Sequence, residues 1–309
     1  MNLVVFVVGP TGSGKSGVAL ALAKRIGGEI ISCDSMQVYR GMDIGTAKPS
    51  VQDRKEVKHH LLSIISPQEE HSVFTHRQLV LSKISSIVKR GRIPILVGGS
   101  GFYIKTLIDG LPNNLGKHDD TRKKLEVRAR RYGLEKLHDE LRSIDPVRAA
   151  AIHVNDKKRV IRALEVWELS KKRPTEMTPN GRCLTSLGVH PVIFGLKHNR
   201  PHLYRRIEKR VDWMIQHGWI DEVKRLRKIK FSKTAESAIG YREIHEYLQG
   251  RKTLKDIVSE IKKNTRRLAK KQMTWFRKDP RIKWIRVLPS KKEPTRVCVQ
   301  KILSELSVR

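Results

Sequence analysis

The sequence predicts an α/β fold with a three-layer core, a mostly parallel sheet and an all-helical insertion domain. Three observations support this fold class. Apolar runs of strand length alternate with helical stretches over residues 1–110, and this alternation is typical of a parallel sheet covered by helices. Short, strongly charged helical segments then replace the strand pattern. A later apolar run, residues 191–196, returns the chain to the sheet.

The first part of the chain contains three expected strands and two expected helices. The strands are Val4–Val8, Glu29–Cys33 and Ile93–Val97, and the helices are Val18–Ile26 and Thr75–Lys89. The first helix repeats its apolar residues on one face and ends at a pair of glycines, as amphipathic helices do. Ligands of parallel sheets bind at the carboxyl ends of the strands. We therefore expect the residues that follow these strands to form one site.

After Leu111-Pro112 the pattern changes. Helical segments are expected at residues 121–131, 134–142, 146–152 and 156–170, with no apolar strand among them. We therefore predict a core made of residues 1–112 and 191–309, and a helical insertion domain made of residues 113–190.

Two long helices are expected in the last third of the chain. The first begins at Pro201, which suits a first helical turn, and ends near Gly218. The second runs from Thr253, a plausible cap, to Phe276. Its expected inward residues are Leu254, Ile257, Ile261, Leu268 and Trp275. Its expected outward residues are basic, namely Lys262, Lys263, Arg266, Arg267, Lys270 and Lys271, and we interpret this face as a contact for nucleic-acid phosphates.

The residues GPTGSGKS directly after the first strand spell a phosphate-binding loop. Glycines let the backbone bend so that several N–H groups converge on one anion, while Lys15 adds positive charge and the Ser16 hydroxyl reaches a magnesium ion. The core is therefore expected to be P-loop NTPase-like, with a polyphosphate as one ligand. The members of the loop are Gly9, Pro10, Thr11, Gly12, Ser13, Gly14, Lys15 and Ser16.

The charge of the chain is strongly positive. Lys and Arg number 64 against 31 Asp and Glu, a formal net charge of +33. Residues 1–110 hold 14 basic and 8 acidic side chains, whereas residues 111–309 hold 50 and 23. Structured nucleic acid is the partner that best matches this excess. A membrane surface is the alternative, but there is no lipidation signal and no apolar run of about 18 residues or more.

Cysteine usage and the start of the chain bear on location. Cys33, Cys183 and Cys298 are far apart and odd in number, so neither a disulfide framework nor a Cys-x-x-Cys metal site is expected. The apolar start is too short for a secretion signal and lacks a basic lead. We expect a cytoplasmic protein.

The motif alone does not determine which reaction the phosphate loop serves. Phosphate loops of this spelling usually serve hydrolysis or transfer of phosphoryl groups, and such enzymes need a second strand that ends in a metal-binding Asp. The strand ending at Val97 is followed by glycines instead. Asp34, at a strand end beside the loop, either binds a metal through water or accepts a proton. An RNA-binding P-loop kinase or ATPase is therefore an alternative, as is a non-catalytic RNA-binding protein.

The segment Asp34–Pro49, DSMQVYRGMDIGTAKP, closely resembles the block after the phosphate loop in the tRNA dimethylallyltransferase (tRNA isopentenyltransferase) family. No zinc-binding module follows Trp284, as it does in some eukaryotic relatives, so the chain resembles the bacterial form. Ser16 stands where Thr is common. Further blocks in the family's order are His59–Leu62, Val97–Tyr103, Arg162–Val166, Gly240–Glu243 and Thr265–Phe276.

The resemblance implies a prenyl transfer. A dimethylallyl group would pass from dimethylallyl diphosphate to N6 of the adenosine just 3′ of the anticodon, in tRNAs that read codons starting with U. Diphosphate would be released and Mg²⁺ would be required. The phosphate loop would then hold the departing diphosphate, and no nucleoside triphosphate would be consumed. A relative that prenylates free AMP or ADP would not need so basic an insertion.

The resemblance also assigns residues. Asp34 would remove the proton from the adenine amine, Arg210 and Thr11 would complete the catalytic group, and Gly9–Ser16 would bind the diphosphate, with Ser16 on the metal. Residues that would meet the tRNA are Asp34, Ser35, Met36, Gln37, Ser100, Arg122, Lys158, Arg159, Val160, Ile161, Arg162, Ser237, Ala238, Ile239, Gly240, Tyr241 and Arg242. The insertion would grip the anticodon stem while the target base is flipped outward. The expected partners are the tRNA anticodon stem-loop and dimethylallyl diphosphate, without a membrane, and we expect a monomer.

Overall fold

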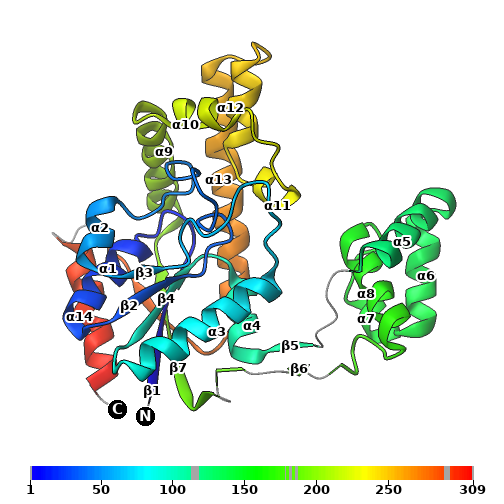
Figure 1. The fold of residues 1–309 in the computed structure, drawn as a ribbon, viewed down its shortest axis with the longest axis horizontal. Coiled ribbons are helices and arrows are strands. Elements are labelled where there is room, and N and C mark those ends of the chain that lie inside the picture. Colours follow the sequence, from blue (N-terminus) through cyan, green and yellow to red (C-terminus); the bar gives the residue numbers. More distant parts are fainter. Residues whose placement is uncertain are drawn as a thin grey trace. The chain divides into compact units, whose positions relative to one another are not determined.

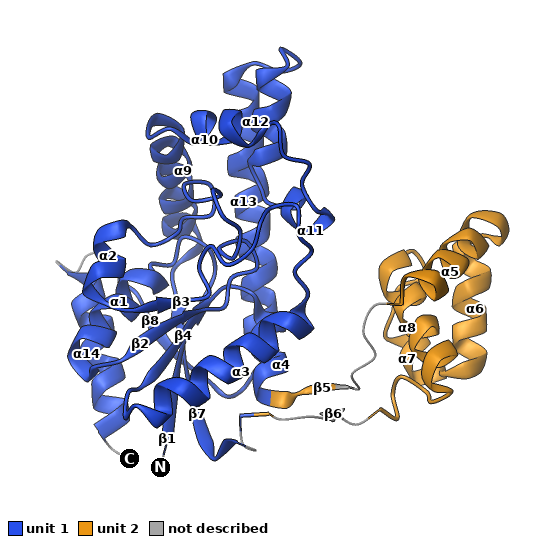
Figure 2. Ribbon diagram, in the orientation of Figure 1, with its two compact units in different colours: residues 1–108, 184–309 blue, residues 109–183 orange. Residues whose placement is uncertain are grey.

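The structure is a computed structural model that describes residues 2–112, 118–177, 179–180, 183–184, 187–288 and 293–307. The chain divides into two compact units, unit 1 with residues 1–108 and 184–309 and unit 2 with residues 109–183 (Figure 2). The sequence analysis places the return to the core later, at residue 191. The return comes earlier because Leu184 and Val189 already pack in the core of unit 1.

Unit 1 contains a six-stranded sheet in the order β3-β2-β4-β1-β7-β8, and each neighbouring pair is parallel. The sheet places Val7 beside Val97 on one side and Phe194 on the other. Four of its strands are expected from the sequence, with ends shifted by one to three residues, while the short edge strands β3 and β8 are not. The strands are β1 Asn2–Val8, β2 Glu29–Ser32, β3 His59–His60, β4 Pro94–Gly98, β7 Val189–Lys197 and β8 Ile282–Arg286.

Helices cover both faces of this sheet (Figure 1). Successive side chains of a strand point to opposite faces, and β1 illustrates this. Phe6 packs with Val80 among the helices on one face, and Val7 packs with Leu22 among those on the other. The expected three-layer α/β core is therefore confirmed. The helices are α3 Val73–Lys89 and α4 Gly101–Asp109 on the first face, and α1 Lys15–Ile26 and α14 Pro294–Ser307 on the second.

A second group of helices lies beyond the carboxyl ends of the strands (Figure 1). These helices enclose a core of their own, in which Trp219, Tyr241 and Ile261 are buried together with Tyr39 and Met42 from the segment after β2. The segment 34–49 is therefore packed under these helices, while the short helix α2 Val51–Glu56 follows it. The helices are α9 Arg200–Gln216, α10 Trp219–Leu226, α11 Lys233–Glu236, α12 Tyr241–Leu248 and α13 Leu254–Phe276.

Helix α13 begins as expected, because the Thr253 side chain accepts the N–H of Asp256 in a capping box. Its buried stripe differs from the expected one. Leu254, Leu268 and Trp275 are exposed to 39%, 37% and 39%, so their inward assignment is wrong. The stripe instead consists of Ile257, Ile261, Thr265, Ala269 and Phe276. The small Ala269 packs against α9, next to Leu203 and Ile207, and this contact sets which face turns inward.

Unit 2 contains the helices expected for the insertion. They enclose a separate core that includes Leu125, Leu141 and Leu164. The short strands β5 Leu111–Pro112 and β6 Pro179–Asn180 pair antiparallel, so the two ends of the unit meet. The helices are α5 Asp119–Tyr132, α6 Leu134–Ile144, α7 Pro146–Ala150 and α8 Lys157–Ser170.

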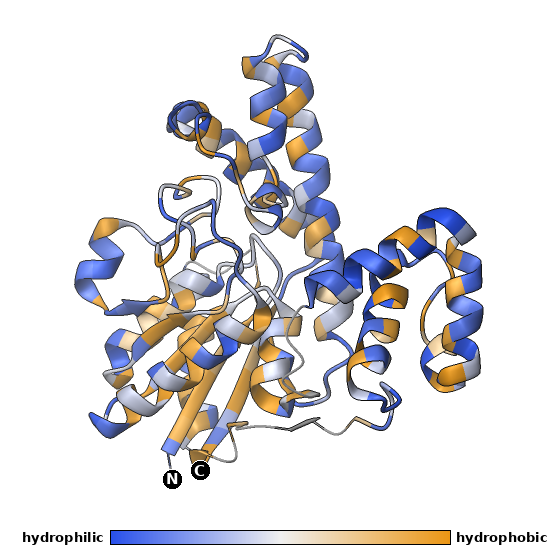
Figure 3. Ribbon diagram, turned by 45° about the vertical axis from the view of Figure 1, so that its right-hand side comes forward, coloured by the Kyte–Doolittle hydropathy of each residue, from blue (hydrophilic) through white to orange (hydrophobic). Residues whose placement is uncertain are grey.

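Hydropathy follows these layers. The strands of the sheet are apolar, whereas the outer faces of the helices are hydrophilic (Figure 3). Over the ranges that the structure describes, each helix is too short or too polar to cross a bilayer.

Candidate active site

A pocket at the carboxyl ends of β1, β2 and β4 brings together residues from distant parts of the chain. Six residues expected in the site line it, namely Thr11, Lys15, Ser16, Asp34, Gln37 and Arg210. Its remaining lining residues are Ile30, Ser32, Thr46, Ala47, Pro49, His59, Leu62, Val97 and Gly98. The phosphate loop, the segment after β2 and helix α9 therefore contribute to a single pocket.

The phosphate loop has the backbone that its glycines permit. Gly12 and Gly14 have φ angles of +81° and +84°, in the left-handed region that other residues rarely adopt. Helix α1 starts directly after Gly14, and no side chain in the described part of the chain caps it there. The first N–H groups of this helix therefore point into the pocket without an internal partner, which favours an anion.

Three side chains from the later part of the chain hold the backbone of the loop. The Gln272 carbonyl Oε1 accepts the Thr11 N–H at 2.8 Å, Arg206 Nε donates to the Gly12 carbonyl at 2.9 Å, and His198 Nε2 donates to the Ser13 carbonyl at 2.8 Å. Sequence analysis did not find these three residues. Gln272 lies in the family block Thr265–Phe276, but neither that block nor any motif assigns these residues to the loop, because each contact joins positions that are far apart in the chain.

Two cations and one carboxylate set the charge of the pocket. Loss of water around the Lys15 ammonium lowers its pKa from 10.5 to about 8, although nearby Asp34 opposes this change and Arg210 adds to it. Burial likewise lowers the pKa of Arg210, whose Nη2 donates to the hydroxyl of Thr11. Cations with so little water gain strongly from a bound anion.

Asp34 lies two residues after the end of β2 and lines the pocket. One of its carboxylate oxygens accepts the Met36 N–H at 2.9 Å, which fixes its orientation. The neighbouring strand β4 ends in a glycine, Gly98, because any Cβ at this position would lie only 2.3 Å from the carbonyl oxygen of Cys33. The close approach of the two strands therefore excludes an acidic side chain at the end of β4. Among the residues that line the pocket, the acidic one is Asp34.

The segment after Asp34 is held from two sides. The Ser32 hydroxyl donates a hydrogen bond to Gln37 Oε1 at 2.9 Å. Gln37 Nε2 in turn donates to the carbonyls of Thr46 and Ala47 at 3.2 and 3.1 Å. Glu222, which is 1% exposed, accepts the N–H groups of Asp43, Ile44 and Gly45 at 2.8, 2.7 and 3.1 Å, and also the hydroxyl of Tyr241 at 2.7 Å. Glu222 was also missed, since an acid on an amphipathic helix gives no signal of burial.

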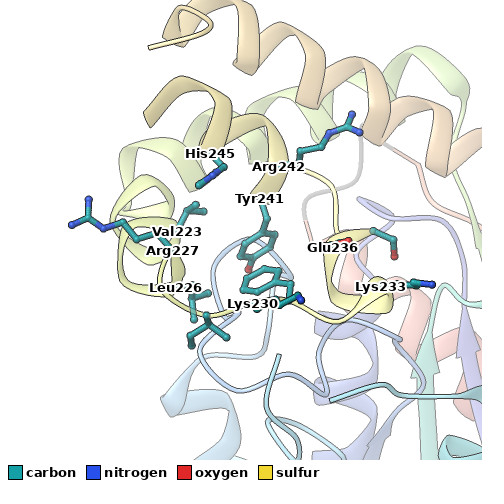
Figure 4. Close-up of a pocket in the computed structure, with 12 residues that line it drawn as sticks. Val223, Leu226, Arg227, Lys230, Lys233, Glu236, Tyr241, Arg242 and His245 are labelled. Carbon is teal, nitrogen blue, oxygen red and sulfur yellow. The ribbon is translucent and has the colours of Figure 1, made fainter. Parts of the chain in front are cut away.

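A second hollow lies between α10, α11 and α12, and it is lined by three residues expected to meet RNA, Ser237, Tyr241 and Arg242. Figure 4 shows Tyr241 in its centre, between Arg227 and Lys233. Its charged lining consists of Arg227, Lys230, Lys233, Arg242, Glu236 and the titratable His245. Ala238 and Gly240 are buried beside it and Ile239 is half-buried. Basic side chains therefore surround the aromatic ring of Tyr241 in this hollow.

The remaining expected residues differ in exposure. Ser35, Met36 and Ser100 are half-buried. In unit 2, Lys158 and Arg159 are exposed, whereas Val160 and Ile161 pack inside the core. Arg122 and Arg162 both donate to the buried carboxylate of Glu165, at 2.7 and 3.0 Å. The side chains of Lys158 and Arg159 are thus the most available to a partner.

The IPP transferase family matches residues 37–279. The chain belongs to this family. It is 45% identical to the tRNA dimethylallyltransferase of Carboxydothermus hydrogenoformans, over 99% of this chain and 97% of that protein. It is 42% identical to the tRNA dimethylallyltransferase of Bacillus subtilis, over 93% of this chain and 91% of that protein. The expected family is therefore confirmed.

Solved structures agree with this assignment. The full-length tRNA isopentenylpyrophosphate transferase of Bacillus halodurans matches with a TM-score of 0.71 and 40% identity, over 99% of this chain and 97% of that one. A eukaryotic dimethylallyltransferase acting on tRNA matches with a TM-score of 0.83 and 26% identity, over this whole chain and 80% of that one. These relatives support a tRNA-modifying prenyltransferase with a P-loop NTPase-like core over a kinase or ATPase.

Proposed function

We propose that this protein transfers a dimethylallyl group from dimethylallyl diphosphate to N6 of the adenosine just 3′ of the anticodon, in tRNAs that read codons starting with U. The names of its relatives support this activity. One observation carries the proposal: an anion-binding loop, two desolvated cations and a carboxylate share one pocket. A leaving diphosphate and a reacting amine need these groups together.

Asp34 acts on the amine. The bond from the donor carbon to the diphosphate oxygen breaks as the bond from that carbon to N6 forms, and N6 loses one proton. The adenine amine is a weak nucleophile because its lone pair is delocalised into the ring. A carboxylate that accepts the proton as the new bond forms lowers this barrier, and the presence of Asp34 in the pocket lining supports this role.

The phosphate loop acts on the leaving group. Negative charge grows on the diphosphate as the carbon–oxygen bond breaks, and groups already aimed at that charge stabilise the transition state. These groups are N–H groups of the loop Gly9–Ser16, the Lys15 ammonium, the Arg210 guanidinium and the hydroxyl of Thr11. Pro10 has no N–H, and the N–H groups of Thr11 and Ser13 already bind Gln272 and the Pro10 carbonyl. The stabilising groups are held by the rest of the protein before substrate binds, so little reorganisation is needed.

Mg²⁺ fits the donor set of this pocket. The described residues contain no group of three or more His, Cys, Asp and Glu that would form an all-protein metal site. The pocket instead offers the hydroxyl of Ser16 beside the phosphate loop, and Mg²⁺ typically combines few protein ligands with substrate phosphates and water. Ser16 would hold the ion, which when bound neutralises charge on the diphosphate.

The RNA-binding surface includes the basic residues outside the pocket. Ser35, Met36, Gln37 and Ser100 lie around Asp34 and would meet the target base and its neighbours. The residues of Ser237–Arg242 would meet the anticodon loop beside the basic hollow of Figure 4. In unit 2, the insertion domain, Arg122, Lys158, Arg159 and Arg162 would contact the anticodon stem, whereas Val160 and Ile161, which were also expected to do so, are buried in the core of the unit. We propose a monomer that acts in the cytoplasm.

One experiment tests the reaction. The protein is incubated with unmodified tRNA, Mg²⁺ and labelled dimethylallyl diphosphate, while labelled ATP serves as the donor in a parallel reaction. Label should enter tRNA from the prenyl donor alone. Asp34→Asn should slow transfer by about 10²-fold or more because the proton acceptor is lost. Asp221→Ala, which removes an exposed carboxylate of α10, is the matched control and should retain the wild-type rate. Turnover of ATP, or full activity of Asp34→Asn, would contradict the proposal.

A further inference from the structure

Gln272 links helix α13 to the phosphate loop. Its Oε1 accepts the Thr11 N–H at 2.8 Å across 261 positions of sequence. Its Nε2 lies beside Gly99, where a Cβ would approach it to 2.4 Å. The amide group is therefore fitted between the phosphate loop and the turn that follows β4.

Thr11 is held at two points. Gln272 binds its backbone N–H, and Arg210 donates to its hydroxyl. Because Gln272 accepts the Thr11 N–H, it fixes the orientation of the peptide between Pro10 and Thr11. That orientation decides where the Thr11 hydroxyl lies.

Helices α9 and α13 form one block around this contact. Arg266 pairs with Glu208 at 2.6 Å, and Lys262 pairs with Asp212 at 2.6 Å. Both acids belong to α9, which also carries Arg210. The position of Gln272 relative to Arg210 is thus fixed by ion pairs and by the packing of Ala269.

The opposite side of α13 is basic and exposed. Lys263, Arg267, Lys270 and Lys271 all face solvent, and charge complementarity makes this face suited to RNA phosphates. One helix therefore presents cations to the RNA on one side and holds Thr11 on the other.

The geometry points to Gln272 as a positioning residue for prenyl transfer: by fixing Thr11 it places the threonine hydroxyl on the diphosphate. This inference rests on the proposed function, and it adds a residue to which neither the motif nor the resemblance gives a role. Thr11 lines the active-site pocket whereas Gln272 is not among its lining residues, so Gln272 acts through Thr11.

The test compares Gln272→Ala and Gln272→Glu with the wild type. Binding of inorganic diphosphate with Mg²⁺ is measured by calorimetry without tRNA, and kcat and KM are measured for both substrates. Gln272→Ala should bind diphosphate at least about fivefold more weakly, the effect of one hydrogen bond, and kcat should fall while KM for tRNA stays constant. Gln272→Glu keeps the acceptor but adds negative charge, so it should bind diphosphate more weakly still.

Two further variants separate this role from the alternatives. Lys271→Ala should raise KM for tRNA and leave diphosphate affinity unchanged, and Gln300→Ala, exposed on α14, should match the wild type in both. If Gln272→Ala raises only KM for tRNA, or lowers only the melting temperature, the positioning role is wrong. Failure of the wild type to prenylate tRNA would instead contradict the proposed function, and the diphosphate affinities would still decide the role of Gln272.

Discussion

Lys15 and Arg210 are two cations that lack much of the water a cation normally keeps. Asp34 is close enough to each to raise its pKa, yet burial outweighs this effect in both. Such a site is unfavourable when empty and becomes favourable when an anion enters. At the residue scale, we therefore expect the affinity of the pocket for diphosphate to depend on the protonation of Lys15, whose pKa is about 8.

This dependence predicts a pH effect on binding. Below a pH of about 8 Lys15 carries its proton and diphosphate affinity is fully present. As the pH rises through that value the proton is lost and affinity falls. Calorimetry at pH 7 and pH 9 in buffers of different ionisation enthalpy should also detect proton uptake on binding. The Lys15→Arg variant keeps its positive charge over this pH range. Any fall in affinity that the wild type shows and this variant does not is therefore due to deprotonation of Lys15. Identical profiles for the two proteins would contradict the prediction.

At the element scale, Glu222 joins three pieces of unit 1. It belongs to α10, it binds three successive N–H groups of the segment 43–45, and it accepts the hydroxyl of Tyr241 from α12. Proximity to Glu222 adds to burial in raising the pKa of Tyr241, so this phenol stays protonated and keeps donating. The segment that lines the active-site pocket is thereby tied to the wall of the basic hollow.

Removal of Glu222 should destabilise unit 1. Glu222→Ala leaves several buried donors without partners, and we expect a loss of about 3 kcal/mol or more in the free energy of unfolding. Denaturant unfolding measures this loss, and Asp221→Ala, the exposed neighbour on the same helix, should cost less than about 0.5 kcal/mol. Equal stability of the two variants would show that Glu222 does not hold these elements together.

At the scale of the whole molecule, the chain consists of two units with separate cores. Unit 1 contains the complete lining of the active-site pocket. The chain leaves and returns through the paired strands β5 and β6, where Leu111 lies opposite Asn180. The Leu184 N–H also donates to the Leu107 carbonyl at 3.3 Å, so the two ends of unit 1 are adjacent where unit 2 would be removed.

This arrangement predicts the effect of a deletion. Replacing residues 113–178 with a short glycine-serine linker should leave diphosphate binding within about twofold of the wild type, because no residue of the pocket is lost. Affinity for tRNA should fall by about tenfold or more, since the phosphate contacts that we propose for unit 2 would be lost. Calorimetry and filter binding measure the two. Unchanged tRNA affinity would show that the insertion does not contact the RNA.

Local patterns in the sequence were sufficient to predict much of the fold and of the candidate site. The phosphate loop, Asp34 at a strand end, the alternation of strands and helices, the helical insertion and the basic charge all follow from neighbouring residues, and the family resemblance added Arg210. The inward faces of the helices were harder to predict. Leu268 and Trp275 are exposed because the packing of Ala269 against α9 determines which face of α13 turns inward.

Only the tertiary structure determined which distant side chains hold the site. Gln272, Arg206, His198 and Glu222 reach their partners across 177 to 261 positions. They are polar residues of helices or strand ends, and no motif, including the family block that contains Gln272, assigns them a role. The sequence by itself predicted the groups that we propose to meet the substrates, because local motifs and the family resemblance mark them. The tertiary structure decided how those groups are oriented, because orientation depends on contacts that form only when distant segments pack together.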